Sequence, residues 1–190
     1  MTYGRNSFLA EIPAGLDADA AIARALTYFS QVPAHLRGPL KVLRVAVGPN
    51  PMDPYNEKKY GIEGFTSAAT AFNGEITFWN GLDYLREGTF NHEMGHLIGK
   101  AIHDRDSDAL GDFLNTFQQM AAPHDWKDVA RRDGTWVSSY ARTNPDEDFA
   151  EHWEAFLEAR ETGAEALAQF RKTYPNRARF LEQVHEGRER

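Results

Sequence analysis

Apolar residues recur at helical spacing in two stretches of the N-terminal half of the chain. Asp17–Val32 offers an Asp as N-cap, and its apolar face is made by Ala21, Ile22, Ala25, Leu26 and Phe29, with Pro33 as the stop. The second stripe consists of Phe90, Met94, Leu97, Ile98 and Ala101. Each stretch predicts an amphipathic helix, and we expect the second to lie deep in the core.

Between these helices the apolar residues follow the period of strands. Leu40–Val47 alternates, is rich in β-branched residues and runs into Gly-Pro-Asn-Pro, so it predicts a strand followed by a loop. Phe65–Phe72 and Glu75–Trp79 flank Asn73-Gly74, which is the strongest short hairpin signal. We therefore expect two antiparallel strands in this region.

The second strand of the hairpin is expected to form a sheet edge beside the helix that follows it. Its alternation turns Ile76 and Phe78 inward, and Glu75, Thr77 and Trp79 outward. An exposed edge can bind an extended peptide as an additional strand. Glu75, Thr77 and Trp79 are therefore candidate substrate-binding residues.

A long loop and a series of helices complete the expected architecture. Pro49–Gly64 contains three prolines, two glycines and two tyrosines with little periodicity, so we expect a loop that is either disordered or functional, and its place before the second apolar helix makes a substrate-covering flap the more interesting of the two. Helical patterns then predict five further elements: Ser107–Ala121, Asp125–Arg132, Pro145–Arg160, Ala164–Lys172 and Arg177–Glu186. The sequence thus predicts an α+β fold in which a small mixed β-sheet and one helix precede a mostly helical C-terminal lobe.

Chain length and composition limit the number of domains and the kinds of partner. With 190 residues, of which 42% are hydrophobic, the chain is long enough for one core and too short for two. We expect a single domain over residues 1–190, with an α/β lobe over 1–86 and a helical lobe over 87–190. The net charge of −7 and the lack of a Lys/Arg run argue against binding to nucleic acid.

The chain has no cysteine, which excludes a thiol nucleophile, a disulfide framework and thiolate metal sites. A metal would therefore be held by His and carboxylate ligands. No basic segment is followed by an apolar one at the N-terminus, and no run of about 18 apolar residues occurs, so we expect neither an export signal nor a membrane span. The compartment stays open between a cytoplasmic protein, a virus-encoded protein and a piece of a larger secreted one, and so does the oligomeric state.

The second apolar helix carries the candidate chemistry. His92, Glu93 and His96 form an HExxH pattern, and the i, i+4 spacing places both imidazoles on one helix face, one turn apart. Two such imidazoles can bind one divalent metal, and Glu93 beside the first ligand can act as general base. The pattern predicts a metal site that still needs a third ligand.

Two candidates for the third ligand follow the motif directly. His103 lies one residue beyond the position, here Ile102, at which a metzincin pattern places its third His. The acidic cluster Asp104, Asp106 and Asp108 has the first spacings of an EF-hand but lacks its glycine and its final Glu. We expect His103 to be a surface His or one that supports a ligand, and Asp106 to be the N-cap of the next helix.

The third candidate, Glu147, lies at the start of a later helix. Asn144 can act as N-cap, Pro145 as first helical residue and Glu147 as capping-box partner, so Glu147 needs no metal to explain it. Glu147, Glu151 and Glu154 nevertheless share one face of this helix. A zinc peptidase of the HExxH…Glu type requires one Glu as a ligand there, and a second carboxylate one turn later that holds a ligating His by its other nitrogen.

The combination of HEMGH with Tyr140, Glu147 seven residues later and then Phe149-Ala150-Glu151 resembles the catalytic domain of anthrax lethal factor and the related Pro-Pro endopeptidases. The resemblance covers roughly residues 65–157, and Asp148 stands where the toxin has an aromatic residue. It implies a zincin-like fold with a bound Zn²⁺. It also implies a role for each matched residue: His92, His96 and Glu147 as zinc ligands, Glu93 as general base, Tyr140 as stabiliser of the oxyanion or leaving group, and Glu151 as the carboxylate behind a ligating His.

The resulting hypothesis is a zinc-dependent endopeptidase that cleaves a protein or peptide substrate by Glu-assisted attack of a zinc-bound water. Two alternatives stay open. One is an HExxH peptidase of another family, either repressor-cleaving or metzincin-like, which would not require Tyr140 or the Glu147/Glu151 pair. The other is a non-catalytic binding module that zinc only stabilises, although a structural zinc site usually has four ligands and only three convincing ones are found here.

Overall fold

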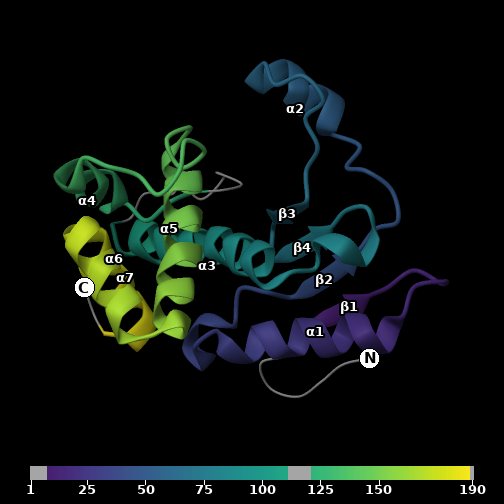
Figure 1. Ribbon diagram of the computed structural model, residues 1–190, viewed down its shortest axis with the longest axis horizontal. Coiled ribbons are helices and arrows are strands. Elements are labelled where there is room, and N and C mark those ends of the chain that lie inside the picture. Colours follow the sequence, from purple (N-terminus) through teal and green to yellow (C-terminus); the bar gives the residue numbers. More distant parts are fainter. Residues whose placement is uncertain (1–7, 111–120, 189–190) are drawn as a thin grey trace.

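The computed structural model describes residues 8–110 and 121–188. In these ranges a small four-stranded sheet with helix α1 (Ala18–Gln31) is followed by a group of helices, so the predicted α+β class is confirmed. Figure 1 shows the two parts side by side, with the helix α3 (Glu87–Leu110) running from the sheet to the helical group. No helix in the described ranges is both long and apolar enough to cross a membrane.

The sheet has the strand order β1-β2-β4-β3. Strand β1 (Leu9–Glu11) pairs in parallel with β2 (Val42–Val45), which pairs in parallel with β4 (Glu75–Phe78). Strand β3 (Ala69–Phe72) is antiparallel to β4 through the predicted Asn73-Gly74 turn, in which both residues have positive φ, 48° and 82°. The strand around residues 40–47 and the hairpin are therefore confirmed, whereas β1 was not predicted.

The expectation that Glu75–Trp79 forms a sheet edge is wrong. Strand β4 lies between β2 and β3, so its backbone is paired on both sides, and β3 is the edge nearest to α3. Glu75 instead binds Arg44 of β2, and the Trp79 indole donates to Thr70 Oγ1 at 3.2 Å. The edge position was misassigned because it depends on pairing with a strand more than thirty residues earlier in the chain, which a local hairpin signal does not contain.

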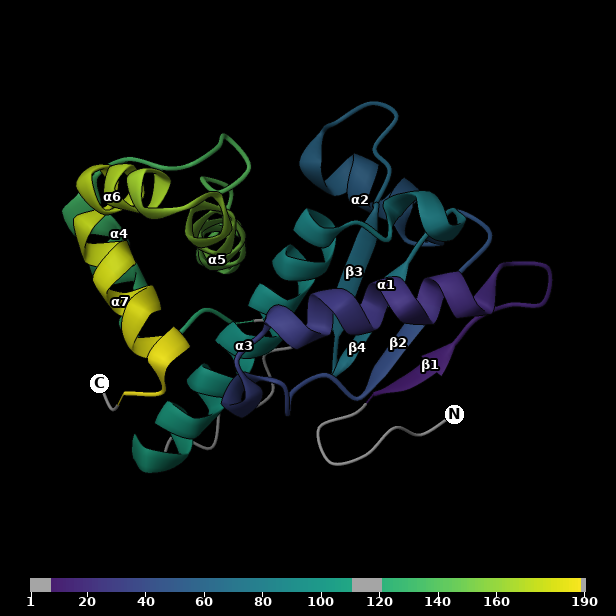
Figure 2. The same cartoon turned by 60° about the horizontal axis from the view of Figure 1, so that its bottom comes forward.

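Helices α1 and α3 cover the sheet and supply much of the core. Asp17 caps α1 as predicted, accepting a hydrogen bond from the Ala20 amide at 2.9 Å. Helix α3 contacts both α1 and β3, and Figure 2 shows α1 lying across the sheet beside α3. The side chains of Phe90 and Met94 are fully buried, so the second apolar helix lies in the core as expected.

Two segments differ from the sequence-based expectation. Helix α3 continues through Asp106, which is therefore not the N-cap of a new helix, and residues 111–120 of the predicted helix Ser107–Ala121 lie outside the described ranges. The supposed flap contains a short helix, α2 (Asp53–Tyr60), which Gly61 ends at a φ of 65°. The carboxylate of Asp53 anchors α2 by accepting hydrogen bonds from the amide and hydroxyl of Ser67.

The four helices predicted after residue 124 are confirmed, with ends that agree within two residues. They are α4 (Trp126–Asp133), α5 (Pro145–Thr162), α6 (Ala164–Thr173) and α7 (Pro175–Glu186). Buried aromatic side chains hold them together, and Trp126 packs edge-on against both Phe149 and Phe180. Helix α5 also packs along α3, which brings the two helices of the candidate site into contact.

Candidate metal centre

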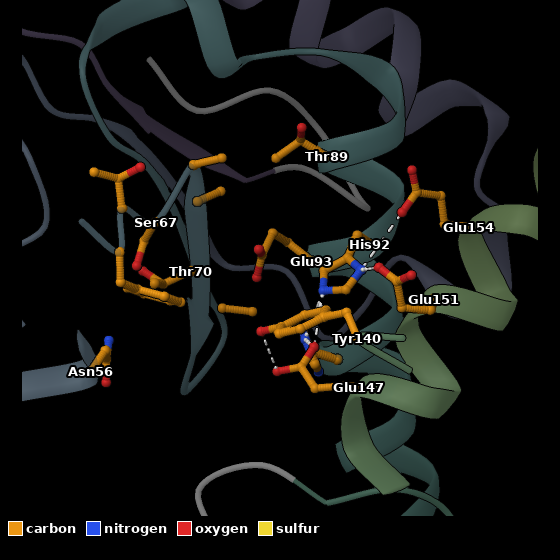
Figure 3. Close-up of a pocket in the computed structure, with 16 residues that line it drawn as sticks. Asn56, Ser67, Thr70, Thr89, His92, Glu93, Tyr140, Glu147, Glu151 and Glu154 are labelled. Carbon is orange, nitrogen blue, oxygen red and sulfur yellow. Dashed lines mark hydrogen bonds and ion pairs between the residues drawn. The ribbon is translucent and has the colours of Figure 1, made fainter. Parts of the chain in front are cut away.

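Helix α3 presents its two motif histidines at one point. The Nε2 atoms of His92 and His96 lie 3.1 Å apart, and both rings are largely buried. The helical spacing places both side chains on the same face, because residues four apart lie one above the other, and their rotamers turn the two Nε2 atoms toward each other. Figure 3 shows His92 and Glu93 extending from α3 toward the space between the strands and α5.

Helix α5 brings Glu147 to the same point. Asn144 caps the helix by accepting hydrogen bonds from the amides of Asp146 and Glu147, both at 2.9 Å, and Pro145 begins the first turn. Glu147 Oε2 consequently lies 3.2 Å from the Nε2 atoms of both His92 and His96. The first turn of α5 thus both forms the Asn144 cap and brings Glu147 to the two histidines.

These three atoms fit a tetrahedral metal ion. Their mutual separations of 3.1 to 3.2 Å are close to the roughly 3.3 Å edge of a tetrahedron with bonds of about 2.0 Å, the length of Zn–N and Zn–O bonds. Glu147 Oε2 is buried and has no well-oriented hydrogen bond, as expected for an oxygen aimed at a shared centre. His92, His96 and Glu147 are therefore a donor set suited to zinc.

The other ring nitrogen of His92, Nδ1, faces the carboxylates of two further residues of α5, Glu151 and Glu154. This nitrogen lies 3.2 Å from Glu151 Oε1 and 3.6 Å from Glu154 Oε2. The second oxygen of Glu151 accepts a hydrogen bond from Ser138 Oγ at 2.7 Å. His92, Glu151 and Glu154 could also surround a cation, but His92 Nε2 already faces His96 and Glu147, so we assign Glu151 and Glu154 to orienting its ring.

The charges of this cluster depend on one another. Burial lowers the pKa of His92, but its contacts with Glu147, Glu151 and Glu154 outweigh burial and raise the pKa to about 12. Burial raises the pKa of Glu147, yet the two histidines hold that pKa well below its usual value, and His92 lowers the pKa of Glu151 as well. The cluster therefore stabilises positive charge at its centre, which a divalent cation also provides.

Glu93 lies on the side of α3 that faces the sheet. It is 6% exposed, and burial raises its pKa, although the two histidines and the backbone of Ala71 on β3 lower it. A carboxylate with a raised pKa, next to the cluster but outside its donor set, has the properties of a general base. The structure places Glu93 between the histidines and the edge strand β3.

Tyr140 lies on the loop before α5, with its hydroxyl at the cluster. The hydroxyl donates to Glu147 Oε1 at 2.9 Å, and the ring centroid is 6.2 Å from that of His92. The side chain is 38% exposed, so it borders solvent rather than the core. The hydroxyl is thus within reach of a group that binds beside Glu147.

A cavity of about 460 Å³ opens onto the cluster. Its walls are residues 65–71, which include most of β3, together with side chains of α3 and α5, Tyr140, and Asn56 from α2. Glu75, Thr77 and Trp79, which were predicted to bind substrate, do not line it. The strand that lines the cavity is therefore the edge strand β3 and not β4.

The alternative ligand His103 lies elsewhere on α3. It stacks on His124 with ring centroids 4.3 Å apart, and both border a separate cavity. Neither His103, Asp104 nor Asp106 belongs to a group of converging metal donors in the described ranges, and the side chain of Asp108 lies outside them. The geometry therefore favours Glu147 over these alternatives as the third donor.

Two glycines allow α3 and α5 to approach this closely. A Cβ added to Gly95 would lie 2.9 Å from Ala150 Cα, and one added to Gly99 would lie 3.0 Å from the Phe149 ring. Gly95 is one of the two variable positions inside HEMGH, so the close approach occurs beside the histidines. The distance of Glu147 from α3 depends on this contact.

Gly95→Ala is expected to push α5 away from α3 and to weaken zinc binding by about 10-fold or more, because Glu147 moves with α5. Overpacking of this kind also costs about 1–3 kcal/mol of stability. Chelator competition and thermal unfolding measure the two effects. Gly38→Ala is the matched control, since a Cβ there meets nothing within 4 Å. Unchanged zinc affinity in Gly95→Ala would contradict the role of this contact.

Comparison with known proteins adds evidence on the fold. The sequence matches no protein family, and no curated protein is significantly similar to it. Among solved structures, the Pro-Pro endopeptidase PPEP-2 from Paenibacillus alvei has a TM-score of 0.58 at 14% sequence identity. The similarity covers 93% of this chain and 97% of that chain. The two chains share a fold. At this identity the similarity is evidence for the fold alone, and it confirms the predicted zincin-like architecture.

Proposed function

We propose that the protein is a zinc-dependent endopeptidase. The observation that carries the proposal is the convergence of His92 Nε2, His96 Nε2 and Glu147 Oε2, with a buried Glu93 beside them, at the floor of an open cavity. Three protein donors leave one position of a tetrahedral zinc free, which is the arrangement of catalytic zinc sites. PPEP-2, which has the same fold, is a Pro-Pro endopeptidase, and the proposal assigns peptide hydrolysis to this chain as well.

The polar residues at the His92–His96–Glu147 cluster have distinct roles in the proposed peptide hydrolysis. His92, His96 and Glu147 would hold a zinc ion, which when bound would supply an activated water and a Lewis acid for the scissile carbonyl. Glu93 accepts the proton of the attacking water and passes it to the leaving amine. Tyr140 turns its hydroxyl from Glu147 toward the oxygen of the scissile carbonyl as negative charge develops there. Glu151 and Glu154 keep the ring of His92 oriented throughout.

The substrate in this proposal is an extended segment of protein or peptide that adds to the sheet at β3. Among the described strands β3 pairs with β4 alone, so its other edge offers backbone groups to a ligand. That edge belongs to the same stretch, residues 65–71, that lines the cavity. Glu93 approaches this strand at Ala71, which brings the proposed base close to a peptide bound along the edge.

The openness of the site argues against the alternative of a binding module that zinc only stabilises. A closed structural site has four protein ligands around its metal. Here the three converging donors face a cavity, and Tyr140 at its rim is 38% exposed. An open site of this kind favours catalysis over a purely stabilising role.

The proposal is tested by metal analysis and by digestion of an unbiased peptide library. We expect about one zinc per chain, cleavage of a subset of the peptides, loss of cleavage with chelator and recovery on addition of zinc. A protein that binds no zinc at neutral pH would refute the metal site. One that binds zinc but cleaves nothing, including unfolded proteins, would favour the binding module.

Tyr140→Phe is expected to lower kcat by about 10² to 10³ and to leave zinc content and KM close to wild type, because the lost hydroxyl acts mainly in the transition state. Steady-state kinetics on a library-derived substrate measures this effect. Tyr55→Phe on α2 is the matched control, since Tyr55 is 59% exposed and does not line the cavity. An unaltered rate in Tyr140→Phe would leave Tyr140 with a packing role only.

A further inference from the structure

Arg177 near the start of α7 is fully buried, although it carries a formal positive charge. Its guanidinium binds the carboxylate of Asp148 in a two-pronged manner, with Nε 3.2 Å from Oδ2 and Nη2 3.0 Å from Oδ1. The indole of Trp126 donates to the same Oδ2 at 2.7 Å. A planar guanidinium bound in this way fixes the direction of its partner as well as its distance.

Asp148 is the residue directly after the candidate ligand Glu147 in the first turn of α5. Consecutive side chains of a helix point about 100° apart, so Glu147 faces α3 while Asp148 faces α4 and α7. A bond that fixes the direction of Asp148 also fixes the rotation of α5 about its axis. The rotation of α5 in turn decides where Glu147 Oε2 lies relative to the two histidines.

The same guanidinium also holds the beginning of the loop that carries Tyr140. Arg177 Nη1 donates to the backbone carbonyl of Thr135 at 2.9 Å, just after the end of α4. Further along, Ser138 accepts a hydrogen bond from the Ala141 amide and donates to Glu151. The loop is therefore tied to α7 at one end and to the cluster in its middle.

We infer that Arg177 is a positioning residue for the candidate centre, which holds Glu147 in place through Asp148 and the Tyr140 loop through Thr135. The inference rests on the proposed function. Arg177 touches none of the reacting groups itself. It joins three separate segments, α7, the first turn of α5 and the loop after α4, and the latter two carry Glu147 and Tyr140.

A role limited to stability would not require this geometry. Arg177 Nη1 also lies 3.5 Å from Oδ2 of Asp133, the last residue of α4. Asp133 does not depend on this contact, because its carboxylate accepts hydrogen bonds from the amides of Asn176 and Arg177 and from the Asn176 side chain. A buried ion pair can often be replaced by apolar residues without loss of stability. What such a replacement removes is the fixed direction of Asp148 and the bond to Thr135.

The test compares zinc affinity and unfolding in Arg177→Lys, which keeps the charge but loses the two-pronged bond. The matched control is Leu181→Ala, which opens a cavity at a fully buried position one turn further along α7. A second variant, Arg177→Met with Asp148→Asn, removes both charges of the two-pronged pair and keeps an oxygen for Trp126. The buried Asp133 carboxylate loses its ion pair with Arg177 but keeps its hydrogen bonds from Asn176 and from the amide of residue 177, so this variant allows the test even if the lysine variant does not fold. Zinc dissociation constants come from chelator competition at a temperature where all the proteins compared are folded.

We expect the Arg177 variants to raise the zinc dissociation constant about 10-fold or more, and at saturating zinc to lower kcat with KM little changed. Leu181→Ala should lower the unfolding midpoint and keep the wild-type dissociation constant within about twofold. If the wild type binds zinc and the Arg177 variants match it in zinc affinity and kcat, the inference is overturned and the proposed function stands. Failure of the wild type itself to bind zinc would overturn both.

Discussion

Replacing Glu93 by Gln is expected to abolish most peptide hydrolysis while the protein keeps its zinc. The amide occupies the same volume but cannot accept a proton, and general base catalysis contributes about 10² to 10⁴ to the rate. Glu93 is not among the converging donors, and it lies on the side of α3 toward β3. We therefore expect kcat to fall by about 10³ or more, measured on a library-derived peptide, with unchanged zinc content.

The matched control for this variant is Glu158→Gln, the same chemical change at an exposed position of α5. It should keep the wild-type rate. Wild-type turnover in Glu93→Gln would exclude Glu93 as the base. Loss of zinc from that variant would show that Glu93 supports the metal instead, and the rate could then not be assigned to proton transfer.

The second large effect is expected for Glu147→Ala, which removes one of the three donors. Loss of a residue behind a metal ligand typically costs about 10- to 100-fold in affinity, and loss of the ligand itself should cost more than 100-fold. The alanine side chain has no oxygen to replace Glu147 Oε2, which lies 3.2 Å from the Nε2 atoms of both His92 and His96. Chelator competition and metal analysis after dialysis measure the effect.

His103→Ala is the control that separates the possible third ligands. His103 borders a different cavity and stacks on His124, so its loss should leave the zinc dissociation constant nearly unchanged. If His103→Ala lost zinc and Glu147→Ala retained it, the third ligand would have to be reassigned. That outcome would contradict the assignment of Glu147 as a ligand, which rests on its distances from His92 and His96.

The candidate centre could be predicted from the sequence because its geometry is local to two helices. The spacing of His92 and His96 determines their shared face, and the Asn144-Pro145 start determines which turn of α5 contains Glu147. The pairing of the two helices came from the family resemblance rather than from periodicity. The structure brings these three side chains together at one point.

Features that depend on distant parts of the chain could not be predicted in the same way. The central position of β4 depends on its pairing with β2, and β1 has only three residues. Helix α2 was missed because its eight residues are mostly polar and have no apolar face. Ser138 reaches Glu151 from a loop, and no residue spacing indicates that contact.

The burial of Arg177 is not encoded in the sequence around it. A charged residue on a helix normally indicates a solvated face, and the sequence around Arg177 offers no reason to expect burial. In the sequence, its partner Asp148 stands out only as a replacement for an aromatic residue of the family pattern. Each charge is explained by the other, and they are 29 positions apart in the chain.

The two glycines in the middle of α3 also affect how the protein folds. Each Gly lowers helix stability by about 0.8–1.0 kcal/mol relative to Ala, so the segment around Gly95 and Gly99 is a weak helix by itself and depends on packing against α5. We therefore expect this part of α3 to become ordered only as α5 docks, late on the folding pathway. The spacing that brings His92 and His96 together would then not exist in early intermediates. In a refolding experiment, the ability to capture zinc should appear with the final docking of the two helices and not with the first helical signal.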